Sequence, residues 1–119
     1  MAQSELAREI HPGLLIGDIL IGQIMIHLGS GVNDRTSLLE ASLMNWPPDV
    51  GQFTDQQVDR RISYLRILGL VDEDQLRLTE AGTTLLEDTT RFAHSAQERR
   101  RSLGLKPLTS IRYQWFLER

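Results

Sequence analysis

The 119-residue chain contains no cysteine, which excludes disulfide bonds and thiolate metal sites. It has only four prolines, and none of its segments carries enough valine and threonine to favour an all-β fold. The N-terminal sequence MAQSELAREI holds two glutamates and lacks the basic start of a signal peptide. We therefore expect a cytoplasmic protein.

The chain also lacks a long uninterrupted apolar run. Its most apolar segment, residues 14–28, contains Asp18, Gln23 and His27, whereas a membrane-spanning helix needs about 20 apolar residues. We expect this segment to form one buried helix that is apolar on most of its circumference, and we expect no membrane partner.

Catalytic and metal-binding patterns are missing as well. The three histidines, His11, His27 and His94, are scattered, and no cluster of His, Asp and Glu has metal-ligand spacing. The glycines of the apolar segment lack the following lysine of a phosphate-binding loop, and no motif places a nucleophile beside a base. The sequence therefore predicts neither an enzyme nor a cofactor or metal site.

What the chain does have is an uneven distribution of charge. The net charge is −3 overall. Residues 1–90 carry six arginines against fourteen acidic residues, a net −8, and residues 91–119 carry seven cations against two glutamates, a net +5. Because the length fits one domain, we expect residues 91–119 to form a basic C-terminal helical extension and tail of the same domain as residues 1–90.

Side chains that can cap helices predict where the first elements begin. Ser4 can cap a short helix through Ile10. Either Asp34 or Thr36 can cap a later helix that stops near Trp46, where two prolines follow.

The stretch RILGLVDEDQLRLTEAG gives the clearest local signals in the chain. A helix that starts at the Thr54 cap ends there at Gly69, because glycine suits the position after a helix. Residues 70–72 and 76–78 then alternate polar and apolar side chains across a short acidic turn. This pattern predicts two short antiparallel strands.

The last third of the chain leaves one element undecided. Thr79 can cap a helix that continues to about Leu103, where Gly104 favours an end. The final stretch LTSIRYQWFLER alternates like a strand, but Ser110 could equally cap a helix.

The stretch TDQQVDRRISYLRILGLVDEDQLRLTEAG resembles the core of the winged helix-turn-helix superfamily, in particular the second half of PadR-type and MarR-type transcription regulators. The resemblance rests on the LGL turn, the short hairpin and the LTEAG start of the next helix. It covers roughly residues 14–90, and closely only residues 54–86. It implies an α+β, mostly α fold: a winged helix-turn-helix domain over residues 1–90, with a short two-strand β-wing and extra N- and C-terminal elements.

The resemblance also implies that helix 54–68 reads the major groove of double-stranded DNA, as in a sequence-specific transcription regulator. Glutamine and arginine can make bidentate contacts with base edges, and tyrosine can hold phosphate. A run of three arginines in the C-terminal extension adds a basic surface beside aromatic residues. The candidate DNA-binding residues are Gln56, Gln57, Arg60, Arg61, Tyr64, Arg77, Arg99, Arg100 and Arg101.

The acidic residues of the expected wing favour a different function. Asp72, Glu73 and Asp74 would oppose the electrostatic attraction that supplies most non-specific DNA affinity. The alternative is a protein–protein interaction module or adaptor subunit without DNA contact. The long connection NWPPDVGQF between two helices could also bind a partner, although we expect Trp46 and Phe53 to pack it onto the core.

Two features predict a homodimer. The segment 14–28 has more apolar surface than a three-helix core needs, and helix 79–103 extends well beyond the expected wing. Two-fold pairing would place two recognition helices about one DNA turn apart. A weaker possibility is a small-molecule sensor, with a pocket between the 14–28 helix and its neighbours.

Overall fold

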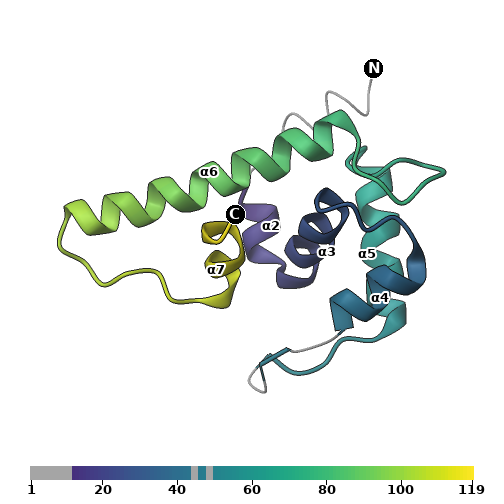
Figure 1. Ribbon diagram of the computed structural model, residues 1–119, viewed down its shortest axis with the longest axis horizontal. Helices are drawn as coiled ribbons and strands as arrows, with labels where there is room; N and C mark the ends of the chain where they lie inside the picture. The colour runs from purple at the N-terminus through teal and green to yellow at the C-terminus, as the bar shows by residue number, and fades with distance from the viewer. Residues whose placement is uncertain (1–11, 44–45, 48–49) are drawn as a thin grey trace.

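The computed structural model describes residues 12–43, 46–47 and 50–119 (Figure 1). These residues form six α-helices. They are α2 (Gly13–Gly17), α3 (Ile19–Gly29), α4 (Arg35–Leu43), α5 (Asp55–Ile67), α6 (Glu80–Ser102) and α7 (Ile111–Leu117). The helix expected from Ser4 to Ile10 lies outside the described residues.

Asp18 divides the apolar segment into two helices, so the prediction of one helix over residues 14–28 is wrong. Its backbone is extended, with φ −104° and ψ 103°. Its side-chain carboxylate accepts hydrogen bonds from the backbone N–H groups of Leu20 and Ile21, at 3.1 and 3.0 Å. Because these N–H groups have no partner within α3, this cap stabilises the start of the helix and fixes the break.

The caps predicted for α4, α5 and α6 are confirmed. Asp34, rather than Thr36, caps α4 by accepting a hydrogen bond from the backbone N–H of Ser37 at 2.8 Å. Thr54 caps α5, and Thr79 caps α6 while its hydroxyl donates to the carbonyl of Gly69 at 2.6 Å.

The predicted α+β winged-helix fold class is wrong, because the described residues form an all-α structure without a β-wing. Where two strands were expected, only Val71 and Leu78 form an isolated antiparallel bridge. The carboxylate of Asp72 accepts the backbone N–H groups of Asp74 and Gln75, at 2.9 and 3.0 Å. This turn uses the residues between the two expected strands, and a pairing this short cannot extend into a stable ladder.

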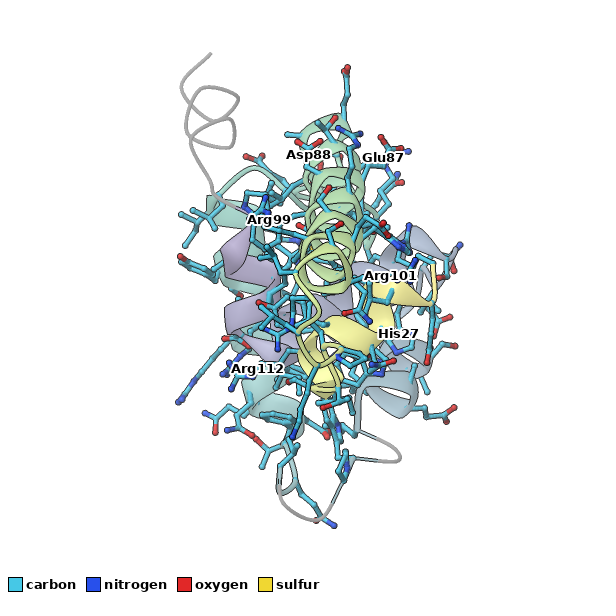
Figure 2. The ribbon with its side chains drawn as sticks, turned by 90° about the vertical axis from the view of Figure 1, so that its left-hand side faces the viewer. His27, Glu87, Asp88, Arg99, Arg101 and Arg112 are labelled. Atoms are coloured by element: carbon cyan, nitrogen blue, oxygen red, sulfur yellow. The ribbon has the colours of Figure 1, made fainter. Side chains whose placement is uncertain are left out.

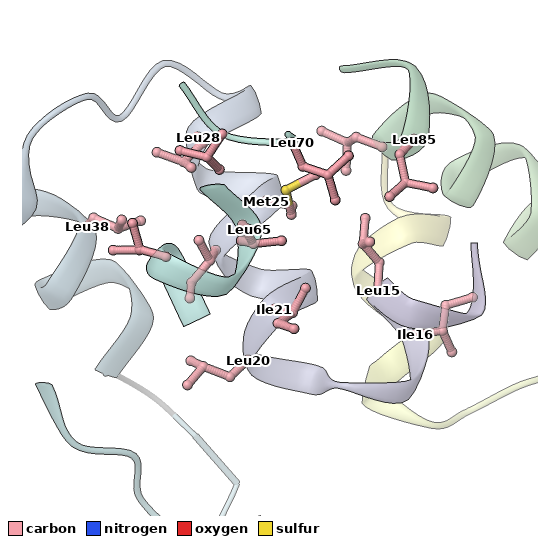
Figure 3. Close-up of a cluster of buried hydrophobic side chains, with 14 of the residues drawn as sticks. Leu15, Ile16, Leu20, Ile21, Met25, Leu28, Leu38, Leu65, Leu70 and Leu85 are labelled. Carbon is pink, nitrogen blue, oxygen red and sulfur yellow. The ribbon is translucent and has the colours of Figure 1, made fainter. Parts of the chain in front are cut away.

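The hydrophobic core surrounds α3, which lies between the other helices (Figure 3). Ile24 and Met25 of α3 are fully buried, as are Leu65 of α5 and Leu70 just beyond it. Val58, Ile62 and Leu65 form the inward face of α5, with the three- and four-residue spacing of an amphipathic helix.

The tail forms the helix α7, which settles the question that the sequence leaves open. α7 packs against α2, α3 and α6, and its Phe116 is completely buried. Trp46 contacts both Phe53 and Trp115 edge-on, with ring centroids 4.7 and 5.3 Å apart, so the loop after α4 is packed onto the body as expected.

Helix α6 crosses the body and continues beyond it, and the chain then returns to α7 (Figure 1). The end of α6 and the following turn therefore project from the rest of the molecule. At 23 residues, α6 spans about 35 Å.

We predict that Gly22→Ala destabilises the protein by about 1–3 kcal/mol, because the added Cβ would collide with the backbone carbonyl oxygen of Leu15 and approach Phe116. Gly17→Ala is the matched control, since nothing lies within 4 Å of a Cβ at that position. Urea unfolding of the two variants measures the difference. Equal stability of the two variants would contradict the close helix approach.

Candidate nucleic-acid interface

Helix α5 has one buried face and one exposed face. Val58, Ile62 and Leu65 point into the core. On the opposite side the exposed residues are Gln56, Arg60, Ser63, Tyr64 and Ile67, and we call this surface the α5 ridge. The ridge is where a partner molecule could contact the helix.

Two of the predicted DNA-contact residues on α5 make contacts with other residues of the fold. Gln57 completes a capping box: its side-chain oxygen accepts the backbone N–H of Thr54 at 2.8 Å, and its own N–H donates to the Thr54 hydroxyl. Arg61 turns toward α3, where its Nε lies 3.5 Å from a carboxylate oxygen of Asp18, within ion-pair range. Both side chains are partly buried.

Arg60 is the predicted contact arginine of α5 that the structure leaves available. It is exposed, and among the described residues no carboxylate forms an ion pair with it. Gln56 and Tyr64 lie one turn to either side. A shallow pocket of about 350 Å³, lined in part by Leu14, Arg60 and Tyr64, lies between this part of α5 and α2.

The remaining cations near α5 are engaged with neighbouring acids or carbonyls. Arg35 of α4 makes a bidentate contact with Asp59, at 2.9 and 3.2 Å. Arg66 donates to the backbone carbonyl of Asp72 at 2.8 Å. The predicted wing residue Arg77 is exposed and lies 3.8 Å from the Asp72 carboxylate. The Arg35–Asp59 pair was missed from the sequence, because the two residues are 24 positions apart.

The segment after α5 is acidic, and its charge is stabilised by the structure. Hydrogen bonds from the backbone N–H groups of Asp74 and Gln75 lower the pKa of the Asp72 carboxyl, and the nearby Arg77 and Arg66 act in the same direction. Asp72 is therefore ionised at neutral pH. Electrostatic repulsion between this segment and a phosphate backbone opposes DNA binding next to α5.

The arginine run Arg99–Arg101 lies at the far end of α6 from α5 (Figure 1). At 1.5 Å per residue, nearly 20 residues of helix separate it by about 30 Å from the start of α6. Arg99 and Arg101 point to opposite sides of the helix (Figure 2). Arg101 pairs with Glu98 at 3.1 Å, and Arg100 donates to the carbonyl of Lys106 at 2.6 Å.

The predicted basic residues are thus not brought together on one face of the chain. The fold separates Arg60 from the arginine run, so one chain presents two small cationic surfaces rather than one continuous surface. Sequence reasoning also missed the exposed leucines Leu103 and Leu105, although the glycine between them indicated a tight turn.

Neither metal binding nor membrane spanning is indicated in the part of the chain that the structure describes. Within it, no three His, Cys, Asp or Glu side chains are grouped as metal ligands would be. None of its helices combines the length and apolar character needed to cross a membrane.

Comparison with known proteins adds no assignment. No protein-family model, no curated protein and no solved structure matches this chain. Function must therefore be argued from its own residues.

His27 is the described histidine whose titration the fold alters. It lies half-buried on α3, 2.8 Å from the side-chain nitrogen of Gln23. Burial lowers its pKa below the ordinary 6.5, while a backbone hydrogen bond with Ala41 acts in the opposite direction. The folded protein therefore binds a proton at this site less readily than the unfolded chain does.

We predict that the free energy of unfolding falls as the pH drops below 6.5 toward the lowered pKa of His27, and that this contribution is constant above 6.5. Urea unfolding of the native protein and of His27→Gln, each at pH 7.5 and pH 5.5, tests this prediction. The variant should lose less stability than the native protein on acidification. Identical losses would show that His27 does not carry the effect.

Proposed function

We propose that this chain is a sequence-specific, double-stranded DNA-binding transcription regulator that contacts the major groove through the α5 ridge and acts as a homodimer. The observation that carries the proposal is the position of Arg60. It stands exposed on the ridge without an ion-pairing carboxylate among the described residues, and Gln56 and Tyr64 flank it. Arginine and glutamine can read guanine and adenine edges, while tyrosine can hold phosphate.

The contacts that hold α5 in place support its proposed role in DNA binding. The Thr54–Gln57 capping box fixes its start. Asp59 forms an ion pair with Arg35 of α4, and Arg61 lies within ion-pair distance of Asp18 at the start of α3. A helix held at several points presents its exposed side chains in a fixed orientation, which lowers the entropic cost of binding. The wing is not part of this proposal.

A second function, a protein-interaction module without DNA contact, is favoured by the apolar side chains on the same ridge. Ile67 is 67% exposed and Tyr64 is 44% exposed. Neither isoleucine nor an acidic neighbouring segment contributes to phosphate contact. The exposed isoleucine and the acidic segment both suit contact with a partner protein whose surface offers apolar and basic groups.

We predict that the full chain binds a duplex of random sequence at low salt, and that Arg60→Ala weakens this binding about five- to tenfold. The reason is that Arg60 is the free cation of the ridge. Fluorescence anisotropy during a salt titration measures both the affinity and the number of phosphate contacts.

Arg91→Ala is the matched control, because Arg91 is an exposed arginine on α6 whose guanidinium lies 3.3 Å from Asp88. Its affinity should stay within about twofold of the native value. If the full chain does not bind DNA even at low salt, the DNA proposal fails and the protein-interaction function becomes the leading one.

A further inference from the structure

The two ends of the molecule expose large apolar side chains. At the end formed by α5, Ile67 is 67% exposed. At the turn after α6, Leu103 and Leu105 are 68% and 50% exposed. We call the first surface, together with residues 72–74, the α5 end, and the second, together with Arg99, Arg101 and Lys106, the α6 tip.

These two surfaces carry opposite charge. Residues 72–74 of the α5 end are three consecutive carboxylates, of which Asp72 lies 3.8 Å from Arg77. The α6 tip carries three exposed cations, Arg99, Arg101 and Lys106, of which Arg101 lies 3.1 Å from Glu98. With these two pairs counted, the α5 end stays negative and the α6 tip stays positive. Each surface therefore combines an apolar centre with charges that the other surface would attract.

The α6 tip is an ordered structure rather than a loose loop. The backbone N–H groups of Leu103, Gly104 and Leu105 donate to carbonyls in the last turn of α6, at 3.1, 3.1 and 2.9 Å. The Arg100 side chain fixes the returning chain through its 2.6 Å bond to the Lys106 carbonyl. The leucines are thus held outward by the turn, so docking them costs little ordering entropy.

The two surfaces cannot neutralise each other within one chain. About 30 Å of helix separates them, which is more than three Debye lengths at physiological ionic strength. A second copy turned by 180° removes this separation, because antiparallel α6 helices place each tip at the partner's α5 end. The same arrangement brings Glu80, in the first turn of α6, toward the arginines in the last turn of its partner's α6.

We propose that the chain forms an antiparallel two-fold dimer in which the α6 tip of each copy docks on the α5 end of the other. This inference rests on the homodimer of the proposed function and specifies its interface. In such a dimer the partner's arginines offset the carboxylates of residues 72–74, which lowers the repulsion that this segment exerts on a phosphate backbone next to α5.

Charge-reversal variants of the two surfaces test the interface, with dimerisation measured by sedimentation equilibrium. The measurement contains no DNA, so a failure of DNA binding does not affect its result. The first variant is Arg99→Glu/Arg101→Glu, and the second is Glu73→Arg/Asp74→Arg. Each variant alone should dimerise at least about tenfold more weakly than the native chain, because like charges face each other twice. An equimolar mixture should recover dimers, since both contacts of the mixed dimer are complementary.

Cross-linking provides a second measurement that does not depend on affinity. Because the native chain has no cysteine, Leu103→Cys and Ile67→Cys can be joined by a short bis-maleimide only where the two engineered thiols meet. Mixing the two variants should give a cross-linked dimer, whereas Leu103→Cys with the control Glu40→Cys on α4 should not. A monomeric native chain, a mixture that stays monomeric, or equal cross-linking to both partners would overturn the proposal.

Discussion

The arrangement of the helices depends on the capped break at Asp18. Its carboxylate receives two backbone N–H groups of α3, and its second oxygen faces Arg61 of α5. One side chain thus ends α2, starts α3 and lies within ion-pair distance of α5. Because the chain turns at this point, α2 folds back until the carbonyl of Leu15 lies against Gly22, where a larger residue would not fit.

This turn also determines how the apolar surface of α3 is covered. The space beside Gly22 receives Phe116 of α7, so the tail of the same chain buries a face that the sequence left without a partner. Excess apolar surface on residues 14–28 therefore no longer argues for a homodimer. The described apolar side chains that stay exposed lie mainly at the two ends of the molecule, beside opposite charges.

Local signals predicted α5 and α6 well, but they missed the break at Asp18 and the contacts between residues far apart in the sequence. Thr54, Thr79 and the spacing of Val58, Ile62 and Leu65 placed α5 and the start of α6 correctly, because caps and apolar periodicity act over a few residues. The strand pattern after Gly69 failed, since the turn at Asp72 leaves a single bridge. At the candidate site, Gln57, Arg60 and Arg61 were predicted together as DNA contacts, and only the tertiary structure shows that Gln57 and Arg61 contact other residues of the fold.

α5 presents the exposed side chains of its ridge, while Gln57, Asp59 and Arg61 contact other residues of the fold. Amide chemical-shift mapping by NMR, during titration with a duplex at low salt, tests whether this ridge binds DNA. We expect the largest shifts along α5, around Gln56, Arg60 and Tyr64. Shifts confined to residues 99–106, or no shifts at all, would contradict it.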